Sequence, residues 1–108
     1  NYTSYWDRDR LEWWIDGDLV RTVNYSEPLT VYGKNYPQTP CQVKVSNWPV
    51  GIKGQSQGNL DWGGGLVDWS DVPFTMTVSK IRVQDFSSGK EYKYTGRTGT
   101  YDSIEVVR

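Results

Sequence analysis

Apolar and polar residues alternate along several short stretches of the chain, and this period of two predicts β-strands. The clearest stretch lies early in the chain, where apolar side chains occupy every second position: Leu11, Trp13 and Ile15. An Asp-Gly dipeptide follows at positions 16 and 17, and this dipeptide tolerates the positive φ angles of a type I′ turn. We therefore predict a β-hairpin over residues 11–23, with its returning strand at residues 18–23.

Trp13 and Trp14 are adjacent in the first strand of this hairpin. Because successive side chains of a strand point to opposite faces, at most one of the two indoles can enter a core. Trp13 shares its face with Leu11 and Ile15, so we assign Trp13 to the core. Replacing it by alanine is then expected to cost about 3–5 kcal/mol of stability, as is typical of a buried tryptophan.

Further strands are predicted at residues 41–46, 74–86, 90–94 and 103–107. In the first of these, Cys41, Val43 and Val45 share one side. Residues 24–40 contain three prolines and a glycine, and they are typical of a long connection. No stretch has a convincing helical period. We therefore predict one domain over residues 1–108 of the all-β class, an antiparallel β-sandwich.

A change of composition marks residues 48–73, which are rich in glycine and contain three tryptophans. A loop of this length in a compact domain is usually either functional or disordered. Three tryptophans in such a short stretch argue against disorder. This segment is therefore the main candidate for a binding site.

The composition favours binding of flat, polar ligands. The chain has 108 residues with six Trp and eight Tyr against two Phe, so most of its aromatic side chains carry a hydrogen-bonding group. Such side chains stack on sugar rings or bases, although they also fill sandwich cores. A net charge of −1 argues against nucleic acid as a partner, because phosphate binding needs a basic excess.

Other chemistries are excluded by what the sequence lacks. It contains no histidine, which rules out Ser-His-Asp triads, Cys-His pairs and His-ligated metals within this chain. We predict no metal and no cofactor. No apolar run approaches the about 18 residues of a membrane-spanning helix, so no span is predicted.

Cysteine and asparagine give two further expectations. Cys41 is the single cysteine, so it is either a buried thiol or paired with a second chain. Asn1 and Asn24 each begin an Asn-x-Thr/Ser sequon, which predicts N-glycosylation and a secreted or cell-wall location.

Four motifs in order resemble one known family. They are LEWWIDGDLVRT at residues 11–22, YPQTP at 36–40, GNLDWGGG at 58–65 and PFTM at 73–76. Together they resemble glycoside hydrolase family 16, and in particular its fungal cell-wall branch, the Crh-type chitin–glucan transglycosylases. The resemblance runs over nearly the whole chain.

This resemblance implies a concanavalin A-like jelly roll, in which two curved antiparallel sheets form a sugar-binding cleft on the concave face. Family members carry a catalytic strand of the pattern Glu-x-Asp-x-x-Glu or Glu-x-Asp-x-Glu upstream of the matched hairpin. One glutamate acts as nucleophile and the other as acid/base. The four glutamates of this chain stand at positions 12, 27, 91 and 105, so the motif is absent and no catalytic residue is assigned. The chain resembles the C-terminal half of such an enzyme.

The same resemblance places three tryptophans along the border of the cleft. Indole faces stack on the C–H faces of sugar rings, and a neighbouring carboxylate accepts bonds from sugar hydroxyls. The predicted substrate-binding residues are Trp48, Trp62, Asp68 and Trp69, and the predicted ligand is a β-linked oligosaccharide or polysaccharide such as chitin or β-glucan. Replacing Trp62 by alanine is expected to remove most of the binding.

Three interpretations stay open at this point. The chain is part of a glycosidase or transglycosylase whose catalytic carboxylates come from a separate or cleaved N-terminal chain, or it is a lectin that binds sugar by itself, or it is a structural fragment. Half of a jelly roll leaves strand edges and an apolar face uncovered, which soluble proteins normally avoid. We therefore expect a complementing N-terminal chain or, failing that, a homodimer.

Overall fold

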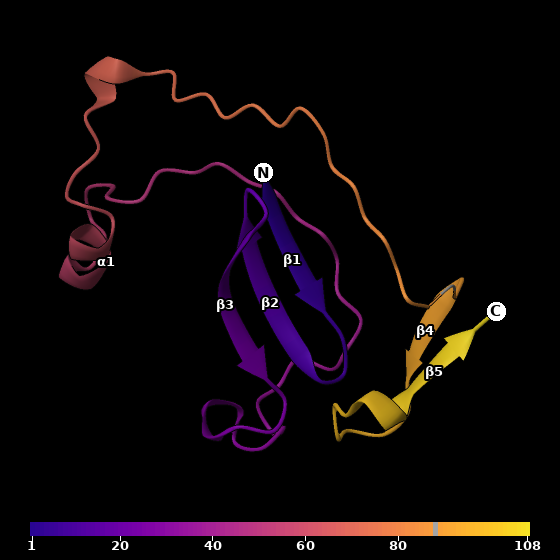
Figure 1. The fold of residues 1–108 in the computed structure, drawn as a ribbon. Coiled ribbons are helices and arrows are strands. Elements are labelled where there is room, and N and C mark those ends of the chain that lie inside the picture. The colour runs from indigo at the N-terminus through magenta and orange to yellow at the C-terminus, as the bar shows by residue number, and fades with distance from the viewer. Residues whose placement is uncertain (88) are drawn as a thin grey trace. The chain divides into compact units, whose positions relative to one another are not determined.

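The computed structural model describes residues 1–87 and 89–108, which form two compact units (Figure 1). The first comprises residues 1–41 and 86–108 and contains every strand found among the described residues, so it is called the sheet unit. The second comprises residues 42–85 and is called the loop unit. Each unit is described by itself.

Three antiparallel strands build the larger sheet of the sheet unit: β1 (Tyr2–Trp6), β2 (Arg10–Ile15) and β3 (Asp18–Asn24). The β2–β3 connection is the predicted Asp-Gly turn, with φ of 50° at Asp16 and 83° at Gly17. Both values lie in the left-handed region, which a two-residue hairpin turn requires. The predicted hairpin and its turn are confirmed.

A second hairpin follows near the C-terminus, where β4 (Glu91–Tyr94) pairs antiparallel with β5 (Ile104–Val107). The short 3-10 helix η3 (Tyr101–Ser103) leads directly into β5. Strands were expected at residues 90–94 and 103–107, so both predictions are confirmed to within one residue.

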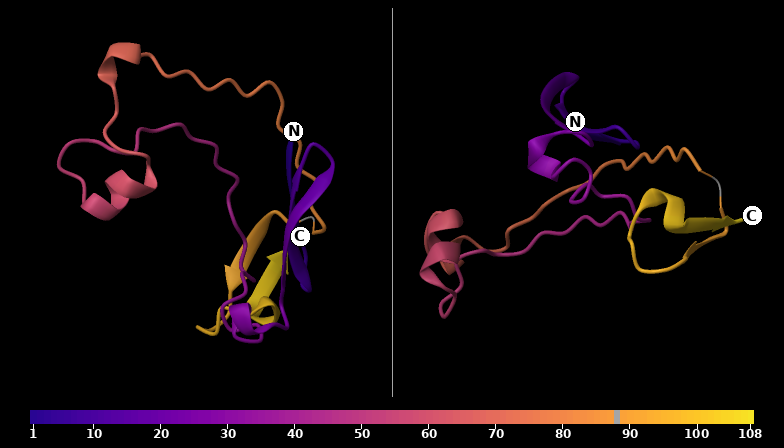
Figure 2. Two further views of the ribbon diagram at one scale, coloured as in Figure 1. Left: turned by 60° about the vertical axis from the view of Figure 1, so that its left-hand side comes forward. Right: turned by 90° about the horizontal axis from the view of Figure 1, so that it is seen from below.

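Side-chain contacts attach this second hairpin to the rest of the sheet unit, whose strands Figure 2 shows from two further sides. The Tyr101 N–H donates to Oε1 of Gln38 at 3.0 Å, and the Arg8 guanidinium lies 3.7 Å from the centre of the Tyr101 ring. Tyr5 and Phe86 meet edge to face with their ring centres 5.8 Å apart. Residues distant in sequence are therefore held together by polar and aromatic contacts.

Asp7 organises the turn between β1 and β2. Its Oδ1 accepts hydrogen bonds from the backbone N–H groups of Asp9 at 2.8 Å and Arg10 at 2.9 Å, while Oδ2 accepts from the Tyr5 hydroxyl at 2.8 Å. The bond from Tyr5, followed by the two backbone bonds, lowers the pKa of the Asp7 carboxyl below its ordinary value. The ionised form is thus the one that fits the fold.

Acid is therefore expected to weaken this turn. The pKa of Asp7 is lower in the folded state than in the unfolded state. The ionised carboxylate therefore stabilises the fold above about pH 4, and this stabilisation is lost as the pH falls through the pKa of the folded state. Urea unfolding followed from pH 6 to pH 2 measures the loss. Asp7→Asn is expected to be less stable at pH 6 and to show a smaller change with acid. If Asp7→Asn lost as much stability between pH 6 and pH 2 as the parent chain does, the role given to the Asp7 carboxylate would be contradicted.

Tyr36 is one of the few buried side chains, at 4% exposure. Its hydroxyl donates to the backbone carbonyl of Asp7 at 2.7 Å, and its ring lies edge to face on Tyr25 at 5.5 Å. Burial, with the nearby carboxylate of Asp7, raises the pKa of Tyr36 to about 12. The side chain therefore stays neutral and pins the 24–40 connection to the β1–β2 turn.

Tyr36→Phe is expected to lower the free energy of unfolding by about 1–3 kcal/mol, because the Asp7 carbonyl loses its hydrogen-bond partner while the ring stays in place. Chemical denaturation followed by circular dichroism measures the effect. Tyr2→Phe is the matched control, since Tyr2 is 86% exposed and should show no change. Equal stability of the two variants would refute the role given to the Tyr36 hydroxyl.

The assignment of Trp13 to a core is wrong for the described chain. Trp13 is 36% exposed. The guanidinium of Arg21, a residue of β3, lies over the Trp13 ring, 5.3 Å from its centre. Trp14, on the other face of β2, is the more covered of the two indoles. The β2–β3 register shifts between Trp13 and Trp14, and which of the two indoles is covered depends on elements that sequence period does not reveal.

Two predicted strands are absent from the described residues. Neither residues 41–46 nor residues 74–86 pair with another segment, although their apolar side chains alternate as expected. A strand exists only as part of a hydrogen-bonded ladder, and no described segment supplies a partner. The alternating side chains are consequently exposed, as in Val43 at 67% and Val83 at 66%.

The loop unit contains the only α-helix of the described residues, α1 (Gln57–Trp62), and the 3-10 helix η2 (Trp69–Asp71). Ser56 caps α1 by accepting from the N–H of Asn59 at 3.3 Å. No helix was predicted here, because six residues are too few to show a helical period. Another short 3-10 helix, η1 (Pro28–Thr30), lies in the connection that follows β3. None of the helices among residues 1–87 and 89–108 has the length and apolarity needed to cross a bilayer.

Candidate functional site

The loop unit is closed at its base by backbone contacts around Gly51. The Gly51 carbonyl accepts from the N–H of Val67 at 3.0 Å, and Oε1 of Gln55 accepts from the N–H groups of Gly51 at 2.7 Å and Ile52 at 2.9 Å. This closure brings the segment before Gly51 beside the segment after Val67. Trp48 and Trp69, which are far apart in sequence, therefore lie along the same pocket.

Glycine is required at position 51 for two reasons. Its φ of 86° lies in the left-handed region, and a Cβ at this position would overlap the carbonyl oxygen of Gly65. The residue is buried against that carbonyl. The close approach of the two backbones is thus possible only without a side chain.

A pocket of about 580 Å³ opens where the two segments meet. This volume lies within the about 300–1,000 Å³ that is usual for small-ligand sites. Its lining combines apolar side chains with a few polar groups, as ligand pockets generally do: Asn47, Trp48, Pro49, Val67, Asp68, Trp69, Asp71, Val72 and Phe74.

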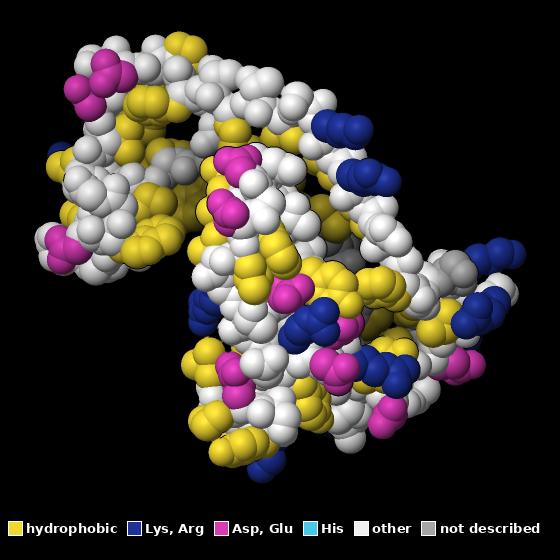
Figure 3. Space-filling model, viewed as in Figure 1, with side chains coloured by type: hydrophobic (Ala, Val, Ile, Leu, Met, Phe, Trp, Pro, Cys, Tyr) yellow, Lys and Arg dark blue, Asp and Glu magenta, His cyan; other side chains and the backbone are white. Residues whose placement is uncertain are grey.

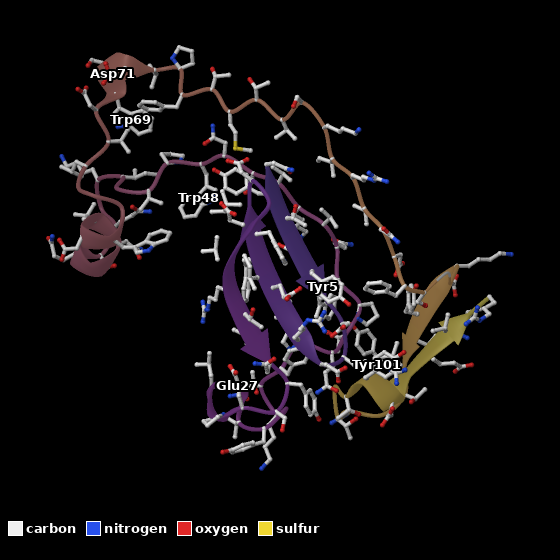
Figure 4. All side chains as sticks on the ribbon, viewed as in Figure 1. Tyr5, Glu27, Trp48, Trp69, Asp71 and Tyr101 are labelled. Atoms are coloured by element: carbon white, nitrogen blue, oxygen red, sulfur yellow. The ribbon has the colours of Figure 1, made fainter. Side chains whose placement is uncertain are left out.

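Two indoles present large open faces in this pocket. Trp48 is 60% exposed and Trp69 is 54% exposed, and they come from the two segments that Gly51 joins (Figure 4). Exposed apolar side chains that gather in one place, rather than singly, often mark a binding site. The pair therefore provides apolar surface for a flat ligand.

Asp68 supplies an anionic acceptor beside the indoles. Its Oδ1 caps η2 by accepting from the Ser70 N–H at 2.9 Å and also accepts from the Ser70 hydroxyl at 2.6 Å. These two bonds lower the pKa of the Asp68 carboxyl below its ordinary value. The group is ionised at neutral pH, and Asp71 adds a second carboxylate to the lining.

The edge of the pocket is tied by a hydrogen bond across its two segments. Nδ2 of Asn47 donates to the backbone carbonyl of Phe74 at 3.0 Å. Both residues line the pocket, and a cis peptide bond joins Val72 to Pro73 just before Phe74. The pocket is therefore held both at its base, through Gly51, and at this edge.

The structure brings together three of the four predicted binding residues. Trp48, Asp68 and Trp69 line the pocket, whereas Trp62 does not, and its side chain on α1 is 75% exposed. Asn47 and Phe74 also line the pocket and were not among the predicted binding residues. Asn47 directly precedes Trp48, which was the one signal that pointed to it.

Other candidate groups lie elsewhere. Cys41 is a free, exposed thiol whose Sγ lies 3.2 Å from the Thr39 carbonyl, so the first of the two alternatives left open for it, a buried thiol, is wrong. Glu12 forms an ion pair with Arg10 at 3.4 Å. Within residues 1–87 and 89–108, no three His, Cys, Asp or Glu side chains are arranged to hold a metal ion.

Comparison with known proteins gives a consistent result. The family model described as glycosyl hydrolases family 16 matches residues 1–64. The chain is 53% identical over 107 residues to Crh-like protein 3 of Aspergillus fumigatus, covering 99% of this chain and 29% of that protein. It is 49% identical over 108 residues to Crh-like protein 2 of Botryotinia fuckeliana, covering 99% of this chain and 24% of that protein.

Two solved structures of a Crh5 transglycosylase, one without ligand and one in complex with NAG, resemble this chain with a TM-score of 0.92 and 34% identity. The match covers 97% of this chain and 43% of the Crh5 chain. This likeness confirms the predicted fold class, an antiparallel β-structure of the jelly-roll type. The chain spans less than a third of the length of the two Crh-like proteins named above.

Proposed function

Since the chain belongs to glycosyl hydrolases family 16, we propose that it forms the carbohydrate-binding C-terminal part of a fungal cell-wall transglycosylase. The observation that carries this proposal is the loop-unit pocket, whose lining includes Trp48, Trp69 and the ionised Asp68. The ligand is a β-linked oligosaccharide or polysaccharide. The NAG bound to the related Crh5 transglycosylase supports a sugar as the ligand class.

The pocket suits a sugar ring for definite chemical reasons. The C–H face of a pyranose packs on an indole, and the two half-exposed indoles provide such surfaces. The carboxylates of Asp68 and Asp71 accept hydrogen bonds from hydroxyls at the ring edge. Because each of these bonds replaces one to water, the net gain per bond is small and the affinity is modest.

The catalytic carboxylates come from outside these 108 residues in this proposal. A retaining glycosidase holds its two carboxyl groups about 5–5.5 Å apart. The glutamates of this chain lie on β2, before η1, on β4 and on β5: Glu12, Glu27, Glu91 and Glu105. None lines the pocket. An N-terminal complement would provide both groups.

The exposed apolar side chains of the loop unit support a complement of this kind. Val43, Phe74 and Met76 are each at least 47% exposed, and Figure 3 shows hydrophobic side chains over the surface. Segments with unpaired backbone and alternating apolar residues invite pairing with further strands. The complement would supply such strands, and a homodimer is the alternative partner. Sedimentation of the native protein should give a species heavier than one 12.5 kDa chain together with any glycans it carries.

A secreted or cell-wall location completes the proposal. The asparagines of both sequons, Asn1 and Asn24, are exposed, as attachment of a glycan requires. Mass spectrometry of the native protein would show whether either site carries a glycan.

The binding function is tested by replacing one tryptophan at a time. Trp48→Ala and Trp69→Ala should each weaken binding of chitotetraose or laminaritetraose by about tenfold or more, since each removes a stacking face. Trp62→Ala is the comparison, because Trp62 is equally large and exposed but lies outside the pocket. Calorimetry measures affinity, and tryptophan fluorescence should shift as an indole leaves water. A loss confined to Trp62→Ala would move the site to α1.

The loop-unit pocket also fits the second interpretation, a lectin. All of the residues that line the pocket lie within residues 42–85, so the described site does not need a catalytic strand for its own formation. One experiment distinguishes a transglycosylase part from a lectin. Mixing the chain with the upstream part of a family 16 domain produces sugar transfer if the first proposal holds, and only binding if the chain is a lectin.

A further inference from the structure

The sheet unit contains a second hollow that the proposed function does not use. It measures about 220 Å³ and lies between the connection that follows β3 and the loop that precedes η3. Its lining is a mixture of aromatic rings, hydroxyls, an amide and an amine: Tyr25, Tyr32, Gly33, Lys34, Gln38, Thr98, Gly99 and Thr100.

One wall of this hollow is built from strained backbone. Val31 and Tyr32 both have φ of 51°, and Gly33 has φ of 100°, so three successive residues are left-handed. A β-branched or aromatic residue adopts this conformation rarely and at a cost in free energy. Such strain concentrates at binding sites, where the surrounding structure maintains it.

The surrounding contacts that hold the strain are specific. Thr30 is buried, and its Oγ1 lies 2.6 Å from the Tyr25 carbonyl and 3.0 Å from the Glu27 carbonyl. The Asn35 N–H donates to the Thr30 carbonyl at 2.9 Å, closing the turn. Gly33 packs directly on the Tyr25 ring, with no room for a Cβ. The effect of this geometry is that Tyr32 projects from the turn and is 67% exposed.

The opposite wall is fixed by Gln38. Its Nε2 donates to the Gly33 carbonyl at 3.1 Å, and its Oε1 accepts from the Tyr101 N–H at 3.0 Å. The single amide thus joins the strained turn to the loop before η3. On that loop the hydroxyls of Thr98 and Thr100 lie 3.0 Å apart at the edge of the hollow.

We infer that this hollow is a second sugar-binding site, which takes one pyranose unit of the same β-linked polysaccharide. The inference rests on the proposed function for its ligand class. Tyr32 offers an aromatic face to the ring, and the Thr98 and Thr100 hydroxyls both donate and accept. Lys34 adds a donor, and none of the described lining residues carries a carboxylate. The volume is below that of the usual drug-sized pocket, which favours a single sugar unit.

Backbone amide chemical shifts in solution test this inference at each site separately. Laminaribiose and diacetylchitobiose are titrated into the ¹⁵N-labelled chain. We expect saturable shifts at Gly33, Gly99 and Thr100, in addition to those around Trp48 and Trp69. Tyr32→Ala should weaken the binding reported by Gly33, Gly99 and Thr100 by about tenfold. The binding reported by residues around Trp48 and Trp69 should stay unchanged. Tyr2→Ala is the matched control, because Tyr2 is exposed and outside the hollow.

Thr98→Ala provides a second variant that removes a hydroxyl without touching the strained turn. Shifts around Trp48 without any at Gly33 and Gly99 would overturn this inference and leave the proposed function intact. Shifts at Gly33 alone would support the second site and contradict the loop-unit pocket. Shifts at Gly33 with inorganic phosphate but with neither disaccharide would show an anion site and overturn the inference.

Discussion

No cleavage or transfer of β-1,3-glucan or chitin oligosaccharides is expected from the purified 108-residue chain by itself. A positioned acid–base group contributes about 10²–10⁴-fold to such reactions, and a covalent nucleophile adds to this. The glutamates at positions 12, 27, 91 and 105 do not line the pocket, and Glu12 is engaged with Arg10. Product analysis of labelled oligosaccharides by chromatography measures the rate.

The positive control is the same chain mixed with a family 16 N-terminal segment that carries the paired glutamates. Transfer should appear on mixing, and it should vanish when either of those glutamates is replaced by glutamine. Turnover by the isolated chain at a comparable rate would show that its own carboxylates suffice, and the proposed division of labour would then be abandoned.

Gly51→Ala is expected to weaken sugar binding in the loop unit by more than tenfold and to loosen residues 48–69. The left-handed backbone alone costs about 1–3 kcal/mol with a side chain, and the new Cβ also overlaps the Gly65 carbonyl. The bond between the Gly51 carbonyl and the Val67 N–H would be lost, so Trp48 and Trp69 would no longer be held together. Calorimetry and amide hydrogen exchange follow the two effects.

Gly54→Ala is the matched control for that variant. Gly54 has a similar φ of 97°, but a Cβ there would meet nothing within 4 Å. Both variants place a side chain on left-handed backbone and share that conformational cost. The difference between their sugar affinities therefore measures the effect of the overlap with the Gly65 carbonyl. Equal binding by both would mean that the closure at Gly51 does not position the pocket.

Local sequence signals predicted those elements whose partners lie nearby in the chain. The Asp-Gly turn, the β2–β3 hairpin and the separate strands β4 and β5 were predicted because alternation and turn residues are local properties. Residues 41–46 and 74–86 show the same alternation but form no ladder. Their sequence indicates a half-buried strand, yet the backbone partner such a strand requires is not among the described segments.

The site shows the same division between local and distant information. Trp48, Asp68 and Trp69 were selected from a motif resemblance and from the chemistry of sugar binding, and the structure places them in one pocket. Trp62 was selected on the same grounds but lies on α1, which was too short to detect. Which face of β2 is covered, and hence the environments of Trp13 and Trp14, depended on contacts that no local pattern specifies.

The closure of the loop unit at Gly51 and Val67 has a consequence for how this fold diversifies. Residues 52–66 form a loop whose two ends are joined by the hydrogen bond between Val67 and Gly51. Most residues of this loop are exposed. The entropy cost of closing a loop rises only slowly with its length, so insertions between these two anchors are inexpensive. Mutations can therefore reshape the surroundings of the pocket without moving the indole pair. The closure thus allows residues 52–66 to change in length while the backbone that carries Trp48 and Trp69 stays anchored at Gly51 and Val67.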